Sequence, residues 1–155
     1  MLSVQHIHPM LVHFPIVLII LVAAVETVSV ALGRDVTGRS PLGNLATAMI
    51  VLAALAAIAS FYFGDIALTI AENGGFESDV AEVHEGLGRF VAIVFSVWAI
   101  VRVAMWWRNI RLTRPVAFVM PMVSIVGAGL VVWTAYYGGK LVFDLGVNVA
   151  KAAGG

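Results

Sequence analysis

An otherwise apolar sequence carries a small set of side chains that can ligate a metal ion or bind an anion. Imidazole nitrogens ligate haem iron, zinc and copper, carboxylates orient such imidazoles, and cationic side chains bind carboxylate groups. The candidates are His8, His13, His84, Asp65, Arg89 and Lys140. The chain has no cysteine, which excludes disulfides, thiolate metal sites, iron–sulfur clusters and thioether-linked haem. Metal chemistry must therefore rest on histidine and carboxylate ligands.

The composition shows what kind of element holds these side chains. Of the 155 residues, 61% are hydrophobic and 12% are charged, and the mean hydropathy is +1.01. Soluble domains contain roughly 45–50% apolar and about 25% charged residues, so a soluble globular protein is excluded. Basic and acidic residues number nine each, which leaves no net basic field to attract nucleic acid.

Apolar runs between clusters of charge predict four membrane-spanning helices. Each run is long enough to cross a hydrocarbon core of about 30 Å. We therefore expect an all-α fold, an integral membrane four-helix bundle that forms a single domain over residues 1–155. The sequence shows no evident repeat period. The predicted spans cover about 10–32, 45–70, 87–107 and 116–137, and residues 138–155 form a tail.

The charged residues between the spans predict how the bundle sits in the membrane. The connections 33–44 and 108–115 carry five arginines, whereas the connection 71–86 carries several acidic residues and no lysine or arginine. Because cytoplasmic loops are enriched in lysine and arginine, we expect the first two connections in the cytoplasm and the third on the exterior or in the periplasm. The chain is then a multi-pass protein of the inner membrane with both termini and the tail on the periplasmic side.

With this topology all the candidate ligands fall at the periplasmic ends of the spans. His8 and His13 open the first span, and their five-residue separation places them about 140° apart on a regular helix. We therefore expect one ligand from this helix rather than two. Pro15 removes an amide donor, which favours an irregular and open stretch beside His13. We predict His13 and His84, which opens the third span, as a pair of axial ligands.

The surroundings of His84 favour a flat ligand such as haem b. Gly86 and Gly88 leave room for a planar macrocycle to approach the helix. A haem between helices needs axial imidazoles and cationic partners for its propionates. Arg89 and Lys140 are the expected propionate partners.

The remaining two candidates have supporting roles in this interpretation. Asp65 orients a ligand histidine through its second ring nitrogen, or pairs with Arg89. His8 contacts the site from outside the iron ligands or lines a quinone pocket. A different interpretation is a divalent metal site, zinc or copper, formed by His8, His13, His84 and Asp65. The simplest interpretation is that the histidines are hydrogen-bonded polar residues at the membrane interface.

A second polar layer lies nearer the cytoplasmic ends of the spans. Glu26 in the first span and Arg102 in the third lie at matching depths. Because an unpaired charge inside a membrane costs several kcal/mol, we expect these two residues to form an ion pair. A role in proton relay is the alternative use of the same two side chains.

Several stretches of the chain resemble a bacterial membrane family catalogued as domain of unknown function 2231. They are HPMLVHFPI at the first span, HEGLGR at the third and YYGGKLVFDLGVNV after the fourth. The resemblance covers nearly the whole chain and matches His8, His13 and His84, together with Gly138 and Gly139. The chain departs from the family pattern at Leu145, where relatives often carry histidine. Some members are joined to Rieske-type or cytochrome c-like domains, which implies a redox setting and a periplasmic redox partner of that type.

The sequence as a whole favours a small cytochrome b-like membrane protein that passes electrons between a membrane quinol pool and a periplasmic acceptor. It is expected to be an electron carrier or redox subunit rather than an enzyme acting alone, and it carries no hydrolase or nucleotide-binding motif. The alternative is a non-catalytic membrane subunit that docks a partner complex, and an oligomer is compatible with either. A metal or proton transporter is the weakest alternative because the middles of the second and fourth spans are almost entirely apolar.

Overall fold

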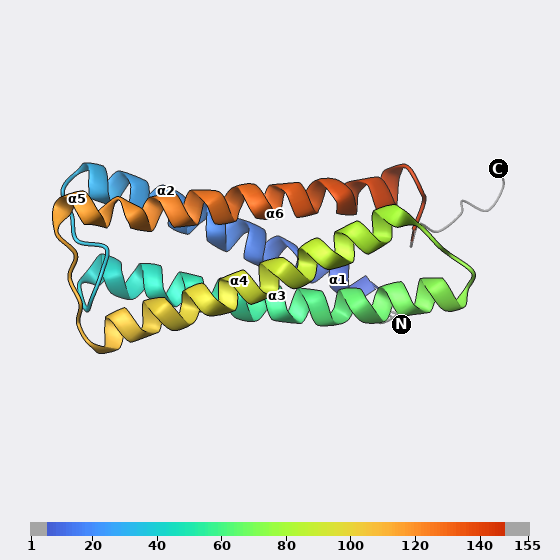
Figure 1. Cartoon of the computed structure of the whole chain (residues 1–155), viewed down its shortest axis with the longest axis horizontal. Coiled ribbons are helices and arrows are strands. Elements are labelled where there is room, and N and C mark those ends of the chain that lie inside the picture. The colour runs from blue at the N-terminus through green and yellow to red at the C-terminus, as the bar shows by residue number, and fades with distance from the viewer. Residues whose placement is uncertain (1–5, 148–155) are drawn as a thin grey trace.

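The computed structural model describes residues 6–147, which form a bundle of four antiparallel helical rods (Figure 1). Two of the rods are interrupted for one residue, the first at Val12 and the fourth at Phe118. The described residues contain no strand, so the predicted all-α fold is confirmed. The helices are α1 (Ile7–Leu11), α2 (His13–Ala31), α3 (Pro41–Asn73), α4 (Asp79–Trp107), α5 (Arg114–Ala117) and α6 (Val119–Phe143).

All four rods are long and apolar enough to cross a membrane. They contain 25, 33, 29 and 30 residues and rise about 1.5 Å per residue, which exceeds the need of a hydrocarbon core about 30 Å thick. The chain is therefore a multi-pass membrane protein. The helices extend beyond the apolar runs, and α6 continues to Phe143, so the first part of the predicted tail is helical. Residues 148–155 of that tail lie outside the described residues.

Local capping explains where the two longest helices begin. The Ser40 hydroxyl accepts a hydrogen bond from the Gly43 amide, and Pro41 occupies the first turn of α3, where no amide donor is needed. The Ser78 hydroxyl accepts from the Val80 amide at the start of α4. These caps satisfy amides that the helix itself leaves unpaired, which fixes the start of each rod.

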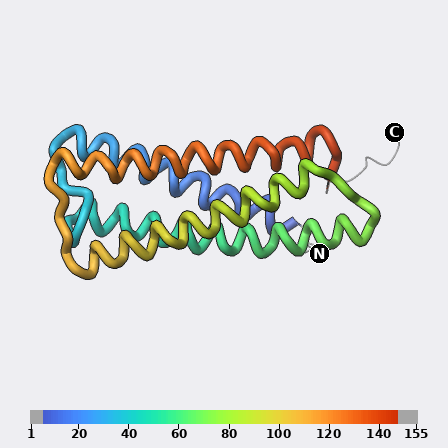
Figure 2. The backbone as a smooth tube through the Cα atoms, in the orientation of Figure 1, coloured from blue at the N-terminus to red at the C-terminus, as the bar shows by residue number. Residues whose placement is uncertain are grey.

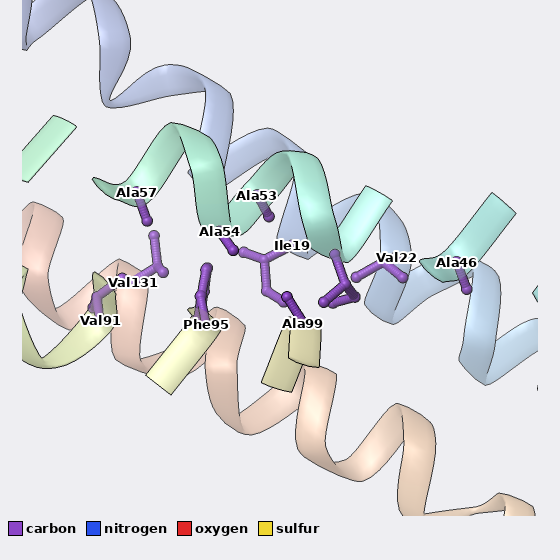
Figure 3. Close-up of a cluster of buried hydrophobic side chains, with 11 residues drawn as sticks. Ile19, Val22, Ala46, Ala53, Ala54, Ala57, Val91, Phe95, Ala99 and Val131 are labelled. Atoms are coloured by element: carbon purple, nitrogen blue, oxygen red, sulfur yellow. The ribbon is translucent and has the colours of Figure 1, made fainter. Parts of the chain in front are cut away.

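The rods pack as a closed ring in the order α2, α3, α4, α6, as the traced backbone in Figure 2 helps to follow. Consequently α2 and α4 lie diagonally across the bundle, and so do α3 and α6. Small and branched side chains fill the centre, among them Ile19, Ala53, Ala57, Phe95 and Val131 (Figure 3). The alanines of α3 let neighbouring backbones approach closely, which is how helices associate within a membrane.

The two ends of the bundle differ in charge. The loops 32–40 and 108–113 lie together at one end, which we call the arginine end because it carries Arg34, Arg39, Arg108, Arg111 and Arg114 (Figure 1). The start of α1, the loop 74–78 and the end of α6 lie at the other. We call this the histidine end, because His8 and His84 lie there.

A buried ion pair joins the diagonal helices α2 and α4 toward the arginine end. Arg102 Nη2 lies 3.2 Å from Glu26 Oε1, and the two side chains are 1% and 0% exposed. The Ser124 hydroxyl of α6 donates a hydrogen bond to Glu26 Oε2, at 2.6 Å. The guanidinium of Arg102 also donates to the Val36 carbonyl and contacts the Met120 sulfur. The ion pair predicted from the matching depths of Glu26 and Arg102 is confirmed.

Candidate functional site

Two histidine rings meet across the bundle at the histidine end. His8 comes from α1, which continues into α2, and His84 comes from α4 on the diagonal rod. The ring centroids are 6.0 Å apart and the ring planes are nearly perpendicular, at 81°. Both side chains are half-buried.

His8 is oriented by the backbone of α3. Its Nδ1 lies 2.7 Å from the carbonyl oxygen of Ser60. Because a carbonyl only accepts hydrogen bonds, Nδ1 carries the proton and donates it. A Cβ atom on Gly64, one turn after Ser60, would lie 2.9 Å from the His8 ring. The absence of that atom lets the imidazole reach the carbonyl of Ser60.

His84 is oriented by the backbone of α6 in the same way. Its Nδ1 donates to the carbonyl oxygen of Thr134, at 3.1 Å. A Cβ atom on Gly138, one turn after Thr134, would lie 3.0 Å from the Cε1 of the His84 ring. Each histidine thus uses one carbonyl and one glycine of a neighbouring helix.

Because these hydrogen bonds use the Nδ1 of each ring, Nε2 is the nitrogen of each ring that keeps a lone pair for a ligand. A hydrogen bond from the other ring nitrogen fixes the tautomer and raises the basicity of the ligand nitrogen. With metal–nitrogen distances of about 2.0–2.1 Å, two imidazoles on opposite sides of one ion have ring centroids roughly 6.4 Å apart. The observed 6.0 Å is close to this value. The distance between the ring centroids is thus compatible with two imidazoles on one metal ion.

The predicted ligand His13 is not brought to this pair. It lies exposed in the first turn of α2. The backbone angles at Val12 are helical, so His8 and His13 keep the separate faces that a regular helix gives them. The inner face carries His8, and the ring contact of His84 is with His8.

The other predicted site residues, Asp65, Arg89 and Lys140, make their own contacts or are exposed. Asp65 is exposed on α3. Arg89 pairs with Glu85 on its own helix and lies 5.8 Å from the Phe61 ring centroid. Lys140 lies two residues after Gly138, with its Nζ 5.9 Å from the centroid of Tyr136. The structure thus pairs Arg89 with Glu85, not with Asp65.

The predicted four-ligand metal site does not assemble in this structure. Across residues 6–147, no group of three or more His, Cys, Asp or Glu side chains lies close enough to hold a metal ion. His8 and His84 meet, whereas His13 and Asp65 are exposed. Any metal at the pair would take two ligands from these described side chains.

The residues that position the two histidines were not among the predicted site residues. They are Ser60, Gly64, Thr134 and Gly138. A signal for them is present in the sequence, because SFYFG at 60–64 and TAYYG at 134–138 share a hydroxyl residue, a tyrosine, an aromatic residue and a glycine in the same order.

Comparison with known proteins gives one match. A family model described as a predicted membrane protein, DUF2231, matches residues 5–151. No curated protein and no solved structure matches the chain.

Proposed function

The chain belongs to the DUF2231 family of predicted membrane proteins, and on this premise we propose that it is a membrane cytochrome that binds one haem b between His8 and His84. Its function is to transfer single electrons at the histidine end of the bundle. This proposal keeps His84 as an axial ligand and replaces His13 by His8 as the other.

The observation that carries the proposal is the facing pair of oriented imidazoles. An ion held by two protein side chains must take its other ligands from elsewhere, and a tetrapyrrole supplies four nitrogens in a plane between two axial imidazoles. The perpendicular rings, 6.0 Å apart, fit this arrangement better than a zinc site, which takes three or four protein ligands. Their half-buried position keeps the site within reach of a redox partner.

The residues around the pair have distinct roles in this proposal. The carbonyls of Ser60 and Thr134 hold the two rings in a fixed orientation. Lys140 is the first choice for a haem propionate, because Arg89 already pairs with Glu85. When bound, the haem supplies an iron that cycles between the ferric and ferrous states. The protein supplies the ligands, the charge and the exclusion of water.

The proposal also places the protein in its membrane. The five arginines of the arginine end support a cytoplasmic location for that end, because the positive-inside bias enriches arginine there. In our proposal the histidine end then faces the periplasm of a bacterial inner membrane. A membrane quinol would then donate electrons, and a Rieske-type or cytochrome c-type protein would accept them, as the redox setting of the family implies. In this proposal the exposed Asp65, the residue after Gly64, contacts such a partner or a quinone.

Visible spectroscopy of the purified protein tests this function. We expect the full chain, expressed in haem-sufficient cells and purified in detergent, to show sharp α and Soret bands in a reduced-minus-oxidised spectrum. Haem quantitation as the pyridine complex should give near one haem per chain. His84→Ala and His8→Ala should each lose the bands, whereas the exposed His13→Ala should keep them.

Other outcomes of the same experiment contradict the proposal in different ways. A folded but colourless wild-type protein would favour a docking subunit without a cofactor, and metal analysis of that preparation would then test for a bound divalent ion. Loss of haem in His13→Ala with retention in His8→Ala would return the axial role to His13.

A further inference from the structure

The two histidines belong to two halves of the chain that repeat each other. The hydrogen bond of His8 to Ser60 spans 52 residues, and that of His84 to Thr134 spans 50. Glu26 follows His8 by 18 residues, and Arg102 follows His84 by the same 18. The first helical hairpin, α1 to α3, thus carries its polar residues at the same places as the second hairpin, α4 to α6.

Sequence motifs agree with this correspondence along both hairpins. HPMLVHF at 8–14 and HEGLGRF at 84–90 share histidine, leucine and phenylalanine at the same spacing. The connections RDVTGRSP at 34–41 and RNIRLTRP at 108–115 share their first arginine and final proline, with aspartate matching asparagine and valine matching isoleucine. The shift between the halves is 76 residues in the first helix and 74 afterwards, so residues 32–33 are an insertion in the first half.

Burial follows the same correspondence. Matched positions in the two halves face the core together, as in the pairs Ile19 and Phe95, Ala23 and Ala99, Ala53 and Gly127, and Ala57 and Val131. Matched positions also face outward together. Phe14 and Phe90 are 59% and 53% exposed, and Tyr62 and Tyr136 are 61% and 62% exposed. Because every helix repeats its faces each 3.6 residues, this agreement supports the alignment of the halves that the motifs give.

The packing of the four rods is also symmetric between the two hairpins. Within the hairpins α2 packs on α3 and α4 packs on α6, while between them α3 packs on α4 and α2 packs on α6. Exchanging the two hairpins leaves this set of contacts unchanged, which is the property of a two-fold axis along the bundle. The matched helices α2 and α4 lie on opposite sides of that axis. His8 therefore meets its own counterpart His84, and Glu26 meets its counterpart Arg102.

We propose that the chain is a duplicated helical hairpin, and that the site on its pseudo-two-fold axis takes a planar metal macrocycle with two like faces, each half contributing one imidazole in the same way. The identity of the ligand rests on the proposed function. Ser60 with Gly64 and Thr134 with Gly138 are then equivalent positioning residues for the two ligands.

The acid–base pair marks where the halves have diverged. On the axis of a dimer of identical hairpins, the residue at position 26 would face an identical residue, and two like charges would repel each other inside the membrane. A fused chain can carry unlike residues there, and it carries Glu26 against Arg102. The pair thereby favours the association of the first hairpin with the second over that of two like hairpins.

Chemical rescue measures whether the two ligands are equivalent. We expect His8→Gly and His84→Gly in the full chain to bind added imidazole and recover the low-spin visible spectrum, with dissociation constants within about threefold of each other. Constants that differ by more than about tenfold would overturn the equivalence. A colourless wild-type protein would instead overturn the proposed function, so the two failures are distinct.

An exchange variant tests the duplication without relying on haem. Ser60→Thr, Phe63→Tyr, Thr134→Ser and Tyr137→Phe in one full chain exchange the matched residues but keep Phe61 against Arg89. This variant should leave the thermal unfolding temperature of the detergent-purified protein unchanged. The control Phe63→Gly with Gly64→Phe, which shifts the glycine by one position, should lower that temperature. Destabilisation of the exchange variant to the level of this control would contradict the equivalence of the halves.

Discussion

The histidine pair and the acid–base pair occupy matching positions on the same axis of the bundle, yet their polar atoms are used differently. Glu26 and Arg102 are fully buried, and they are held by each other, by Ser124, by the Val36 carbonyl and by the Met120 sulfur. Their charges are paired within the chain, although the buried Arg102 Nε has no hydrogen-bond partner among the described residues. The half-buried imidazoles each use one ring nitrogen within the chain. In our proposal the other ring nitrogen binds the haem iron.

Polar side chains in this bundle thus have two kinds of role: one pair stabilises the fold, and the other is proposed to bind a ligand. A charge in the bilayer must be paired, and the buried pair shows how a bundle satisfies that need with its own side chains. The half-buried histidines differ because a second ring nitrogen remains for the proposed haem. The predictions below change one pair at a time, and they run from the largest expected effect to the smallest.

Removing one partner of the acid–base pair should have the largest effect on stability. Arg102→Met leaves Glu26 without its counter-charge, and breaking a buried pair in this way costs about 3–5 kcal/mol. Unfolding of the detergent-solubilised protein, followed by far-ultraviolet circular dichroism, measures the loss. The double variant Glu26→Gln with Arg102→Met removes both charges and should recover most of the stability. A double variant as unstable as Arg102→Met would show that the loss of stability comes from altered packing and not from an unpaired charge.

Removing the hydroxyl that supports Glu26 should have the next largest effect. Ser124→Ala deletes a buried hydrogen bond to a charged group, which is worth about 1.5–3 kcal/mol. Ser96→Ala is the matched control, because the Ser96 hydroxyl donates only to the Ala92 carbonyl of its own helix. The same unfolding assay should show little change for the control. Equal losses of unfolding free energy in both variants would show that the Ser124 hydroxyl does not stabilise the ion pair specifically.

Adding a methyl group beside either histidine should weaken the site. A Cβ at Gly64 or Gly138 would press on a histidine ring, and overpacking of this kind costs about 1–3 kcal/mol. We expect Gly64→Ala and Gly138→Ala to lower haem content to a similar degree. A Cβ at Gly129 would meet nothing within 4 Å, so Gly129→Ala should leave haem content unchanged. Loss of haem in this control would show that haem binding responds to any change in the helices and not to pressure on the histidine rings.

The smallest effect is expected on the redox potential. A cation beside a haem propionate favours the reduced state, so Lys140→Gln should make the midpoint potential more negative while leaving the haem content near that of the wild type. Potentiometric titration of the visible spectrum measures the shift. Arg114→Gln at the arginine end is the control and should leave the potential unchanged. A more positive potential in Lys140→Gln would remove Lys140 from the proposed propionate site.

The sequence predicts much of the fold because one physical rule dominates it. Apolar runs must be helical in a membrane, so the four spans follow directly, and charges at equal depth must pair, which identified Glu26 and Arg102. The choice between His8 and His13 depends on which helix face turns inward. That face is set by the packing of α1 and α2 on α3 and α6, which pattern alone does not determine.

The sequence also contains the duplication, but in a form that is difficult to recognise. Most positions in a span are occupied by interchangeable apolar residues, so matches such as Ile19 with Phe95 carry no signal until their shared burial is known. The insertion at 32–33 shifts the register between the halves and breaks any constant repeat period. The short motifs around His8, His84, Gly64 and Gly138 become informative once hydrogen bonds relate them.

Electron paramagnetic resonance of the oxidised protein at low temperature tests the central claim most directly. Axial imidazoles with perpendicular planes leave two iron d orbitals nearly equal in energy, and the observed angle between the rings is 81°. We therefore predict a single, strongly anisotropic low-spin ferric signal that is lost in both His8→Ala and His84→Ala and retained in His13→Ala. A high-spin ferric signal, or a low-spin signal that survives removal of His8, would contradict ligation by the His8–His84 pair.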